Sequence, residues 1–399
     1  MHDEARTAAE EGIMQGAPPP LDRRVDLANW QLPPWNRWSF QHVSEVLRTA
    51  RIPREGPVWA LPAGPVDLSG VEFTTGSDES TTLGEWLAAS FTDGLLVLRN
   101  GSVAFEHYQN GMAPETLHLS MSVGKSMTSL LVGILAGRGL FDPSSLVTDL
   151  VPELAGSGYA EATVQHLLNM AVALDYVEDY LDPAAEFWKV DVACGFIPDR
   201  PDAPAHCLID LLPTFRRADR PHGDVFLYCS PNTDLLGIMC ERATGTRFAD
   251  LFATELWGPL GAEWDANVGL DPVGTAVVDG GFSVSLRDYA RVGALVLNEG
   301  RAAGRQVVPE AWVRAAWEPN LEPFRRSTAE ALIPGGSYRN KWWGFDGRLH
   351  AWGIHGQLIA IDPASQTVVA IVSSNPLPDD DADFTTHRNL VNALVRSPM

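Results

Sequence analysis

Apolar runs separated by short turn sequences predict strands near both ends of the chain. Residues 94–108 contain two β-prone runs joined by Asn100-Gly101, and an Asn-Gly pair in this setting is a strong signal for a β-hairpin. Residues 357–372 have the same pattern around a proline-containing turn, and residues 341–345 read as one more strand. The pattern therefore indicates antiparallel strands contributed by two distant parts of the sequence.

Other segments have the spacing of helices. Residues 122–138 carry an apolar face, formed by Met127, Leu130, Leu131, Ile134 and Leu135. Residues 39–50 place Phe40, Val43, Val46 and Leu47 at helical spacing, and a last helix is expected over 384–396. Most of the stretch between 123 and 265 reads as helices and loops.

This order of elements predicts an α/β fold, in which an antiparallel sheet flanked by helices carries an inserted, mostly helical domain. The sheet domain is expected to comprise residues 25–122 and 266–399, the helical domain residues 123–265, and the active site should lie between them. Residues 1–24 are small and polar and include three consecutive prolines, so we expect a flexible tail there.

The composition of the chain excludes some classes of function. The 399 residues include 51 acidic and 29 basic side chains, for a net charge of −22, and such a surface repels nucleic-acid phosphates and anionic membranes. The chain starts Met1-His2-Asp3-Glu4, which does not resemble a signal peptide, so a cytoplasmic location is expected. The four cysteines lack zinc-site spacing, and reduced core thiols are the simplest interpretation.

The strongest chemical signal is Ser122-Val123-Gly124-Lys125 at the start of the helix predicted over 122–138. Residues three apart share a helix face, so Lys125 can reach the Ser122 hydroxyl. A lysine that is partly desolvated near the positive end of a helix loses its proton more easily and can then deprotonate a serine. A capping serine beside a surface lysine is the alternative, because this short pattern also arises by chance.

Two competing motifs are each excluded by a single residue. Gly124-Lys125-Ser126 resembles the end of a phosphate-binding loop, but Leu119 stands where that loop needs a glycine. The lipase pattern Gly-x-Ser-x-Gly fails because Ser120 replaces its first glycine. The chain has no His-Glu-x-x-His, and we expect neither a metal nor another cofactor.

Two further segments complete the candidate site. Tyr228-Cys229-Ser230 lies in a polar turn before a helix expected near residue 233, although an ordinary loop tyrosine would fit the same pattern. Gly353 and Gly356 precede a predicted strand and would allow close approach of a ligand to its backbone N–H groups.

Taken in order, these three features resemble the serine β-lactamase and penicillin-recognising superfamily, whose members carry Ser-x-x-Lys, then Tyr-x-Asn or Tyr-x-Ser, then a Lys-Thr-Gly-like strand. The chain is similar to the class C branch, and most similar to the 6-aminohexanoate-linear-dimer (nylon-oligomer) hydrolases. The runs that carry this likeness are 30–38, 118–126, 151–157, 175–184, 228–234 and 353–357.

The resemblance implies roles for the residues that match its motifs. Ser122 would be the acylated nucleophile and Lys125 its general base, while Tyr228 completes the proton network. The backbone N–H groups of Ser122 and Ile354 would form the oxyanion hole. Tyr180 matches a tyrosine that supports amide cleavage by donating to the leaving nitrogen.

The resemblance also implies a set of substrate-contacting residues: Asp191, Phe196, Ser230, Asp279, Trp352, Gly353 and His355. Asp191 matches a carboxylate that contacts a substrate ammonium group. Three positions depart from the pattern. Ala351-Trp352-Gly353 lacks the cation that would clamp a β-lactam carboxylate, Phe196 replaces a tryptophan, and Asp279 replaces an uncharged polar residue.

The sequence therefore predicts a serine hydrolase that cleaves small linear amides of the 6-aminohexanoate type, or esters, through an acyl-enzyme. A promiscuous short-chain carboxylesterase and a non-catalytic ligand sensor on the same fold are the alternatives. We expect a small-molecule substrate and neither nucleic acid nor membrane as partner, and the family suggests a homodimer.

Overall fold

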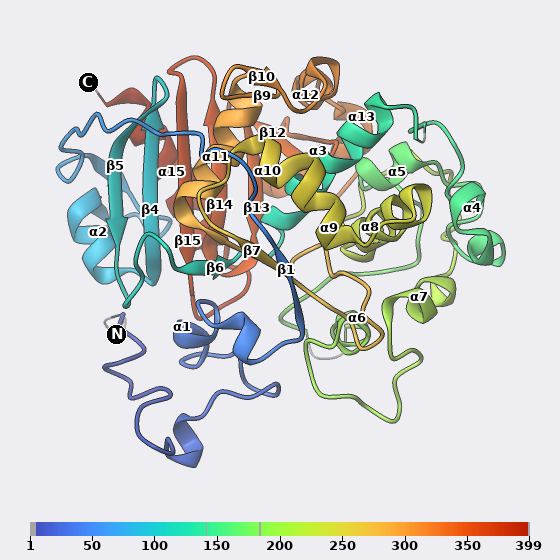
Figure 1. The fold of residues 1–399 in the computed structure, drawn as a ribbon, viewed down its shortest axis with the longest axis horizontal. Coiled ribbons are helices and arrows are strands. Elements are labelled where there is room, and N and C mark those ends of the chain that lie inside the picture. Colours follow the sequence, from blue (N-terminus) through green and yellow to red (C-terminus); the bar gives the residue numbers. More distant parts are fainter. Residues whose placement is uncertain (1–4, 141, 183–184, 398–399) are drawn as a thin grey trace.

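A seven-stranded antiparallel sheet, with strand order β11-β12-β13-β14-β15-β4-β5, forms the centre of the computed structural model (Figure 1). The structure describes residues 5–140, 142–182 and 185–397. The strands of this sheet are β4 (Thr92–Arg99), β5 (Ser102–Tyr108), β11 (Ser337–Arg339), β12 (Trp342–Phe345), β13 (Arg348–Gly353), β14 (Gln357–Asp362) and β15 (Thr367–Ser373). Two segments that lie far apart in the sequence meet where β15 pairs with β4.

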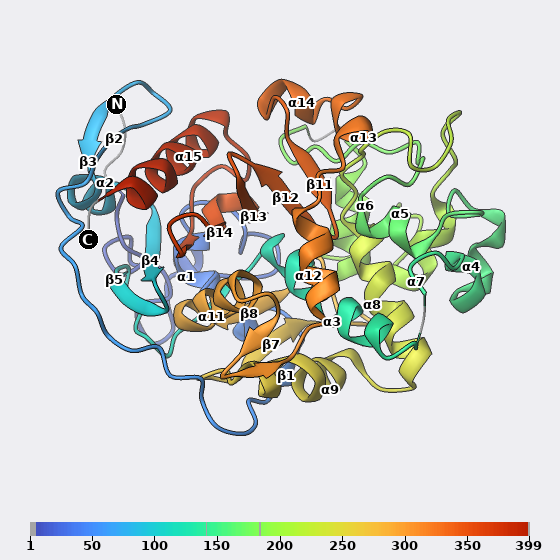
Figure 2. The same cartoon turned by 90° about the horizontal axis from the view of Figure 1, so that it is seen from above.

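Both faces of this sheet are covered, which explains why its strands read as nearly continuous apolar runs. Leu96 and Leu98 of β4 join the core on the side of α11 (Leu286–Leu297). Leu95 and Val97 join a second core against α2 (Leu83–Ala89) and α15 (Asp381–Arg396). Figure 2 shows α11 and α15 on opposite sides of the strands. Alternate side chains of one strand thus enter different cores.

A second, four-stranded sheet leads into the candidate site. Its order is β1-β7-β8-β6, and its strands are β1 (Thr49–Ile52), β6 (Leu117–Leu119), β7 (Ala266–Gly269) and β8 (Phe282–Ser285). Just after β6, the Ser120 N–H donates a hydrogen bond to the Phe282 carbonyl at 2.7 Å. The segment before β8 is therefore held beside the chain that leads to Ser122. Two-stranded ladders join β2 (Glu72–Thr74) to β3 (Ser80–Thr82) and β9 (Arg301–Ala302) to β10 (Arg305–Gln306).

The described residues between β6 and β7 form helices and loops but no strand, and they lie beside the sheets (Figure 1). The α-helices here are α3 (Val123–Gly137), α4 (Val147–Leu150), α5 (Val164–Leu168), α6 (Phe187–Cys194), α7 (Leu208–Leu211), α8 (Pro231–Thr244), α9 (Phe248–Phe252) and α10 (Gly258–Leu260). Later come α12 (Glu310–Trp317), α13 (Leu321–Arg325) and α14 (Ala329–Leu332). The boundaries of an inserted domain stay a prediction.

The local signals for hairpins and for α3 are confirmed. Asn100 and Gly101 both have positive φ, 50° and 76°, as the two-residue turn between β4 and β5 requires. The second hairpin is β14–β15, the expected strand at 341–345 is β12, and α15 begins at Asp381 rather than at 384.

The helix expected over 39–50 is wrong. This segment contains α1 (Asn36–Ser39), a 3₁₀ turn at Val43–Glu45 and then β1. Phe40, Val43 and Leu47 are buried as their spacing suggested. Backbone pairing of β1 with β7, a partner more than 200 residues away, overrides the local periodicity.

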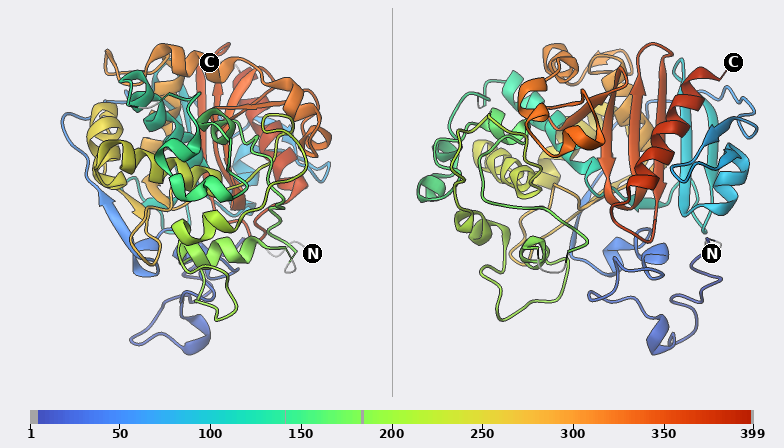
Figure 3. Two further views of the ribbon diagram at one scale, coloured as in Figure 1. Left: turned by 90° about the vertical axis from the view of Figure 1, so that its right-hand side faces the viewer. Right: turned by 180° about the vertical axis from the view of Figure 1, so that it is seen from behind.

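The N-terminal segment also differs from the expected flexible tail. Residues 5–24 fold back on themselves and pack beneath the sheets (Figures 1 and 3). Ile13 is fully buried, and the Ala8 N–H donates to the Asn110 side chain at 2.7 Å. Residues 1–4 lie outside the described part of the chain.

A buried polar network joins this N-terminal region to both sheets. The Asp93 carboxylate on β4 accepts hydrogen bonds from Arg37 at 2.7 Å, Asn110 at 2.9 Å and Ser374 at 2.7 Å. His118 of β6 contacts the same carboxylate at 3.1 Å. Because the charges of Arg37 and Asp93 are both buried, each depends on the other. None of the described helices is long and apolar enough to cross a membrane.

Candidate active site

Ser122 stands at the junction between β6 and α3. It is the residue just before the first turn of α3, where helix N–H groups have no acceptor within the helix. The preceding residue, Met121, is buried and has a positive φ of 44°, an uncommon conformation for a side chain of this size. This tight turn directs Ser122 into two cavities that adjoin it.

Lys125 lies one helical turn beyond the serine and is only 1% exposed. Its Nζ donates to Ser122 Oγ at 2.8 Å and to the Asp279 carbonyl oxygen at 3.0 Å. The Asp279 carboxylate is 3.5 Å away. The expected contact between Ser122 and Lys125 is therefore present, and the lysine is not the surface residue of the alternative interpretation.

Tyr228 completes this group from the loop before α8. Its ring lines the larger cavity together with Ser122, and Lys125 Nζ lies 5.3 Å from the centre of the ring. Burial raises the pKa of Tyr228 well above its usual value, with a further contribution from the nearby Glu178 carboxylate. The indole of Trp343 stacks on the ring at 5.6 Å. Tyr228 therefore has a fixed position and a neutral hydroxyl, unlike an ordinary loop tyrosine.

The end of β13 approaches Ser122 at Gly353. A Cβ atom placed on Gly353 would lie 2.8 Å from the Ser120 carbonyl oxygen and 3.0 Å from the Ser122 nitrogen. Only glycine fits so close to another backbone. Ile354 follows directly and lines both cavities with Ser122.

Tyr180 lies between the two cavities, but its hydroxyl already has a partner. It donates to the carboxylate of Glu178, which also accepts from the Tyr176 hydroxyl at 3.1 Å. Ser230 donates to the same carboxylate through its N–H at 2.7 Å and its Oγ at 2.5 Å. Glu178 thereby fixes the positions of Tyr180 and Ser230. Pro183 and Ala184, matched in the same loop, lie outside the described residues.

Two carboxylates line the smaller cavity, which has a volume of about 30 Å³. Asp191 of α6 and Asp279 face it together with Phe196, whose backbone carbonyl accepts a hydrogen bond from the Trp30 indole at 2.6 Å. Burial, together with the charges of Asp279 and Glu178, raises the pKa of Asp191 to about 8. One oxygen of Asp279, Oδ1, is buried and has no hydrogen-bond partner among the described residues. This acidic pocket is suited to a cation.

The larger cavity has a volume of about 490 Å³ and is dominated by aromatic rings; we name it the aromatic cavity. Its rings are those of Tyr176, Tyr180, Phe226, Tyr228, Trp343, Phe345, Trp352 and Phe384. Glu178 and Asp379 are the acidic residues in its lining. Among the described residues that line it, there is no lysine or arginine.

Not every expected substrate contact reaches a cavity. Trp352 lines the aromatic cavity and Ser230 the acidic pocket, as expected. His355 is 3% exposed, lines neither of them, and its Nδ1 lies 2.7 Å from the Asn375 carbonyl oxygen. Its ring packs edge-on against Phe40, and its pKa is lowered to about 4 by burial. His355 therefore supports the end of β13 from behind.

Sequence reasoning overlooked Glu178, which lines the aromatic cavity, and the buried Lys341, which lines neither cavity. Glu178 alternates with Tyr176 and Tyr180, and in an extended segment such spacing turns all three side chains to one side. This Tyr-x-Glu-x-Tyr pattern was the available signal. Lys341 is fully buried, and its Nζ lies 3.2 Å from Met170 Sδ. Burial, reinforced by the charge of Lys125, lowers the pKa of Lys341 well below its usual value. No sequence pattern indicated its burial.

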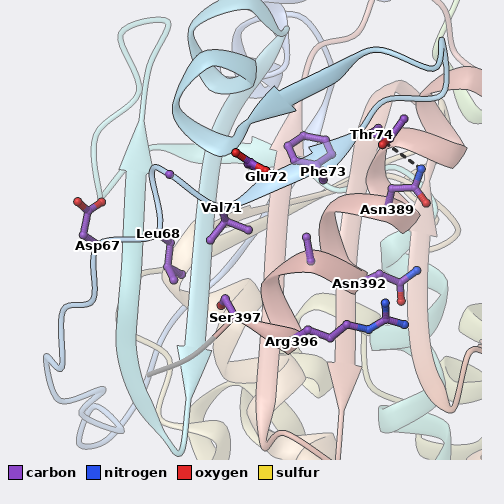
Figure 4. A pocket seen from close by; sticks show the side chains of 12 residues that line it. Asp67, Leu68, Val71, Glu72, Phe73, Thr74, Asn389, Asn392, Arg396 and Ser397 are labelled. Atoms are coloured by element: carbon purple, nitrogen blue, oxygen red, sulfur yellow. Dashed lines mark hydrogen bonds between the residues drawn. The ribbon is translucent and has the colours of Figure 1, made fainter.

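A wider groove of about 750 Å³ lies elsewhere, between β2 and α15 (Figure 4). Asn389 donates to the Thr74 carbonyl across it at 2.8 Å. It contains none of the residues expected to be catalytic. Within the described ranges, no cluster of His, Cys, Asp and Glu could hold a metal ion, and the four cysteines are free and buried.

The fold and this arrangement define a serine hydrolase of the β-lactamase type, and the chain belongs to the Beta-lactamase family, whose model matches residues 89–393. It is 39% identical to the 6-aminohexanoate-dimer hydrolase of Paenarthrobacter ureafaciens over 357 residues, which are 88% of this chain and 89% of that one. Because the chain belongs to this family and is 39% identical to a hydrolase, we exclude the alternative of a non-catalytic ligand sensor.

Solved structures agree on the fold. A Bacillus anthracis protein named as a candidate 6-aminohexanoate-dimer hydrolase superposes with a TM-score of 0.83 at 25% identity, covering 96% of this chain and 100% of the other. EstCE1, a hydrolase with promiscuous acyltransferase activity, has a TM-score of 0.60 at 15% identity, covering 78% of this chain and 96% of its own. The latter likeness concerns the fold alone.

The raised pKa of Asp191 leads to a prediction about stability. Between pH 3.8 and about 8 the folded protein keeps this proton while the unfolded chain releases it, so the free energy of unfolding falls as pH rises through that window. Asp191→Asn mimics the protonated form and should raise the melting temperature more at pH 8 than at pH 5. Asp22→Asn, at a side chain that is 78% exposed, is the control. Equal effects of Asp191→Asn at both pH values would contradict the raised pKa.

Proposed function

We propose that this chain cleaves small linear amides and esters through an acyl-enzyme formed on Ser122. The observation that carries the proposal is the buried triad of Ser122, Lys125 and Tyr228, in which Nζ lies 2.8 Å from the serine oxygen. A serine hydroxyl needs a base to become a nucleophile, and a buried amine at hydrogen-bonding distance supplies one.

The geometry supports the following sequence of steps. Lys125 takes the proton of Ser122 as its oxygen attacks the substrate carbonyl carbon. The backbone N–H groups of Ser122 and Ile354, brought together by the close approach at Gly353, stabilise the negative oxygen. The proton then passes through the network of Tyr228 to the leaving group. Water attacks the acyl-enzyme in the second half of the reaction and releases the acid.

The acidic pocket supports a substrate whose acyl half ends in an ammonium group. A volume of about 30 Å³ is roughly that of one water molecule in the liquid, which suits an ammonium head. Asp191, which keeps its proton below about pH 8 in the free enzyme, would release that proton to solvent and bind the ammonium head through a charge-assisted hydrogen bond. The relative from Paenarthrobacter ureafaciens is named for 6-aminohexanoate dimers, so amino-ended oligomers of this kind are the substrates we propose.

One observation favours a second candidate, a short-chain carboxylesterase. In the structure, Tyr180 donates its hydroxyl to Glu178 and must exchange this partner before it can donate to a leaving nitrogen. An alkoxide leaves without such help, whereas an amide nitrogen has to be protonated. If Tyr180 does not change its partner, the same triad would hydrolyse esters only.

Removal of either the Ser122 hydroxyl or the Lys125 amine should abolish turnover. We expect Ser122→Ala and Lys125→Ala each to lower kcat for esters and amides by about a thousandfold or more, because the two act as one unit. Initial rates on a p-nitrophenyl ester and labelling of the serine by a fluorophosphonate measure this. Ser129→Ala, two turns further along α3, and Lys189→Ala are matched controls and should stay active and labelled. More than a tenth of the parent rate in Ser122→Ala would place the nucleophile elsewhere.

Tyr180→Phe separates the amidase from the esterase. If Tyr180 protonates the leaving nitrogen, kcat for an amide should fall by about a hundredfold or more, and kcat for the ester of the same acid should change little. Tyr176→Phe removes a hydroxyl from the same Glu178 carboxylate and serves as the control. Equal losses on both substrates, together with a lower melting temperature, would assign Tyr180 to packing only.

Asp191→Asn tests the acyl half of the substrate. The kcat/KM for an ester of 6-aminohexanoate should fall by about ten- to a hundredfold, since a charge-assisted hydrogen bond contributes about 1.5–3 kcal/mol. The heptanoate ester carries a methyl group in place of the ammonium and should be nearly unaffected. Asp199→Asn, at an exposed position, should change neither substrate. A ratio of the two kcat/KM values within threefold of the parent's would remove Asp191 from the site.

A further inference from the structure

The connection between β7 and β8 turns beside Lys125 at residues 278–280, which we name the lysine turn. Its Asp279 carbonyl accepts a hydrogen bond from Lys125 Nζ at 3.0 Å. The N–H groups of Val278 and Asp279 have no backbone acceptor among the described residues. Both donate to one oxygen of Asp234, Oδ1, at 2.8 and 3.1 Å. A side chain of α8 therefore holds this turn in place of strand pairing.

A second contact holds the lysine turn from α3. Thr128, three residues after Lys125 on this helix, donates its hydroxyl to the Val278 carbonyl at 3.0 Å. The approach of α8 is also close, because a Cβ atom on Gly237 would lie 2.8 Å from a methyl group of Val278. Thr128 and Asp234 are both fully buried. The turn is thus fixed between two helices by side chains that water does not reach.

The Asp279 carbonyl gives the lysine amine a direction. A carbonyl oxygen only accepts, so one N–H of Lys125 points to it whether the amine is neutral or charged. In the neutral amine the lone pair is then free to face the Ser122 hydroxyl, whose oxygen is 2.8 Å away. The Asp279 carboxylate lies 3.5 Å from the nitrogen, which is longer than an ordinary hydrogen bond, and does not fix this direction. Displacement of the turn would rotate the lone pair away from the serine.

Asp234 itself is separated from the substrate. It lines neither the acidic pocket nor the aromatic cavity. Burial, together with the charge of Asp279, raises the pKa of Asp234 well above its usual value. Its second oxygen, Oδ2, is buried and has no hydrogen-bond partner among the described residues. The contacts with the turn therefore depend on Oδ1, which asparagine keeps and alanine lacks.

We infer that Asp234 is a positioning residue for the base of the hydrolase. By holding the lysine turn, it keeps the Asp279 carbonyl in place and so directs the Lys125 amine toward Ser122. This inference rests on the proposed function, because it takes Lys125 as the base that activates Ser122. Asp234 touches neither the substrate nor the reacting atoms, so its loss should slow the attack of the serine without changing the choice of substrate.

Two replacements of Asp234 test this role. Asp234→Ala removes both hydrogen bonds to the turn and should slow labelling of Ser122 by a fluorophosphonate by about ten- to a hundredfold, because a misplaced reacting group costs about that much. The kcat/KM for a p-nitrophenyl ester should fall by the same factor. Asp234→Asn keeps Oδ1 and should recover most of both rates.

The lysine content of the chain allows a readout that needs no turnover. Lys125, Lys189 and Lys341 are its only lysines, so NMR of carbon-13-labelled lysine gives one Cε signal for each of them. Lys125→Ala and Lys189→Arg assign these signals. The signal of Lys125 should move in Asp234→Ala, because the amine loses its fixed acceptor, and should stay in place in Asp234→Asn.

Asp271→Ala is the matched control. Asp271 is also a buried carboxylate in the β7–β8 connection, and its Oδ1 accepts from the backbone N–H groups of residues 273–275 at 2.7–3.0 Å. This variant should lower the melting temperature but leave the labelling rate and the Lys125 signal unchanged. Equal effects of Asp271→Ala and Asp234→Ala on both readouts would mean that loosening of the connection is responsible, which overturns the inference.

A second variant covers the case in which Asp234→Ala does not fold. Thr128→Val keeps the shape of its side chain and releases the same turn from α3. Slower labelling together with a moved Lys125 signal supports the inference, and parent-like values of both overturn it.

These readouts separate the inference from the proposed function. If the parent is not labelled at Ser122, the proposed function fails, and the Lys125 signal still decides whether Asp234 directs the amine. If the parent is labelled and hydrolyses the ester, but folded Asp234→Ala changes neither the rate nor the Lys125 signal, the inference fails and the serine hydrolase stands.

Discussion

The burial of one lysine amine determines how the active site is built. A lysine that is almost completely removed from water is costly unless hydrogen-bond acceptors surround it, and Lys125 finds them in Ser122 and Asp279. Ser122 belongs to the start of α3, while Asp279 lies before β8. Because β6 and β8 are paired, the two acceptors are fixed on either side of the same nitrogen. The nucleophile, the base and the acidic pocket thus depend on a single buried amine.

The features that could be predicted from the sequence are those determined by neighbouring residues in the chain. Asn100 and Gly101 adopt a turn by their own conformational preferences, and the apolar face of α3 recurs every helical turn. The Ser122–Lys125 contact follows from helix geometry alone. Motif resemblance then supplied Tyr228, Tyr180 and the acidic residues, which lie far apart in sequence and share no local signal.

The errors arose where distant contacts override local preference. Residues 49–52 pair with β7 instead of extending a helix, and residues 5–24 pack through Ile13 and through the Asn110 side chain. His355 has the sequence neighbours of a ligand contact but is turned behind β13, with a positive φ of 60°. Its direction depends on the Asn375 carbonyl, which no pattern around residue 355 indicates.

The order of strands in the large sheet has a consequence for synthesis of the chain. The hairpin β4–β5 is made early, but β15, the other neighbour of β4, is made close to the end. Until then one backbone edge of β4 is unpaired, and an unpaired strand edge favours association with other chains. The nascent protein on the ribosome is therefore most prone to aggregation between the synthesis of β5 and that of β15. A growing cell should depend on chaperones over that interval, although the finished sheet buries both faces of the strand.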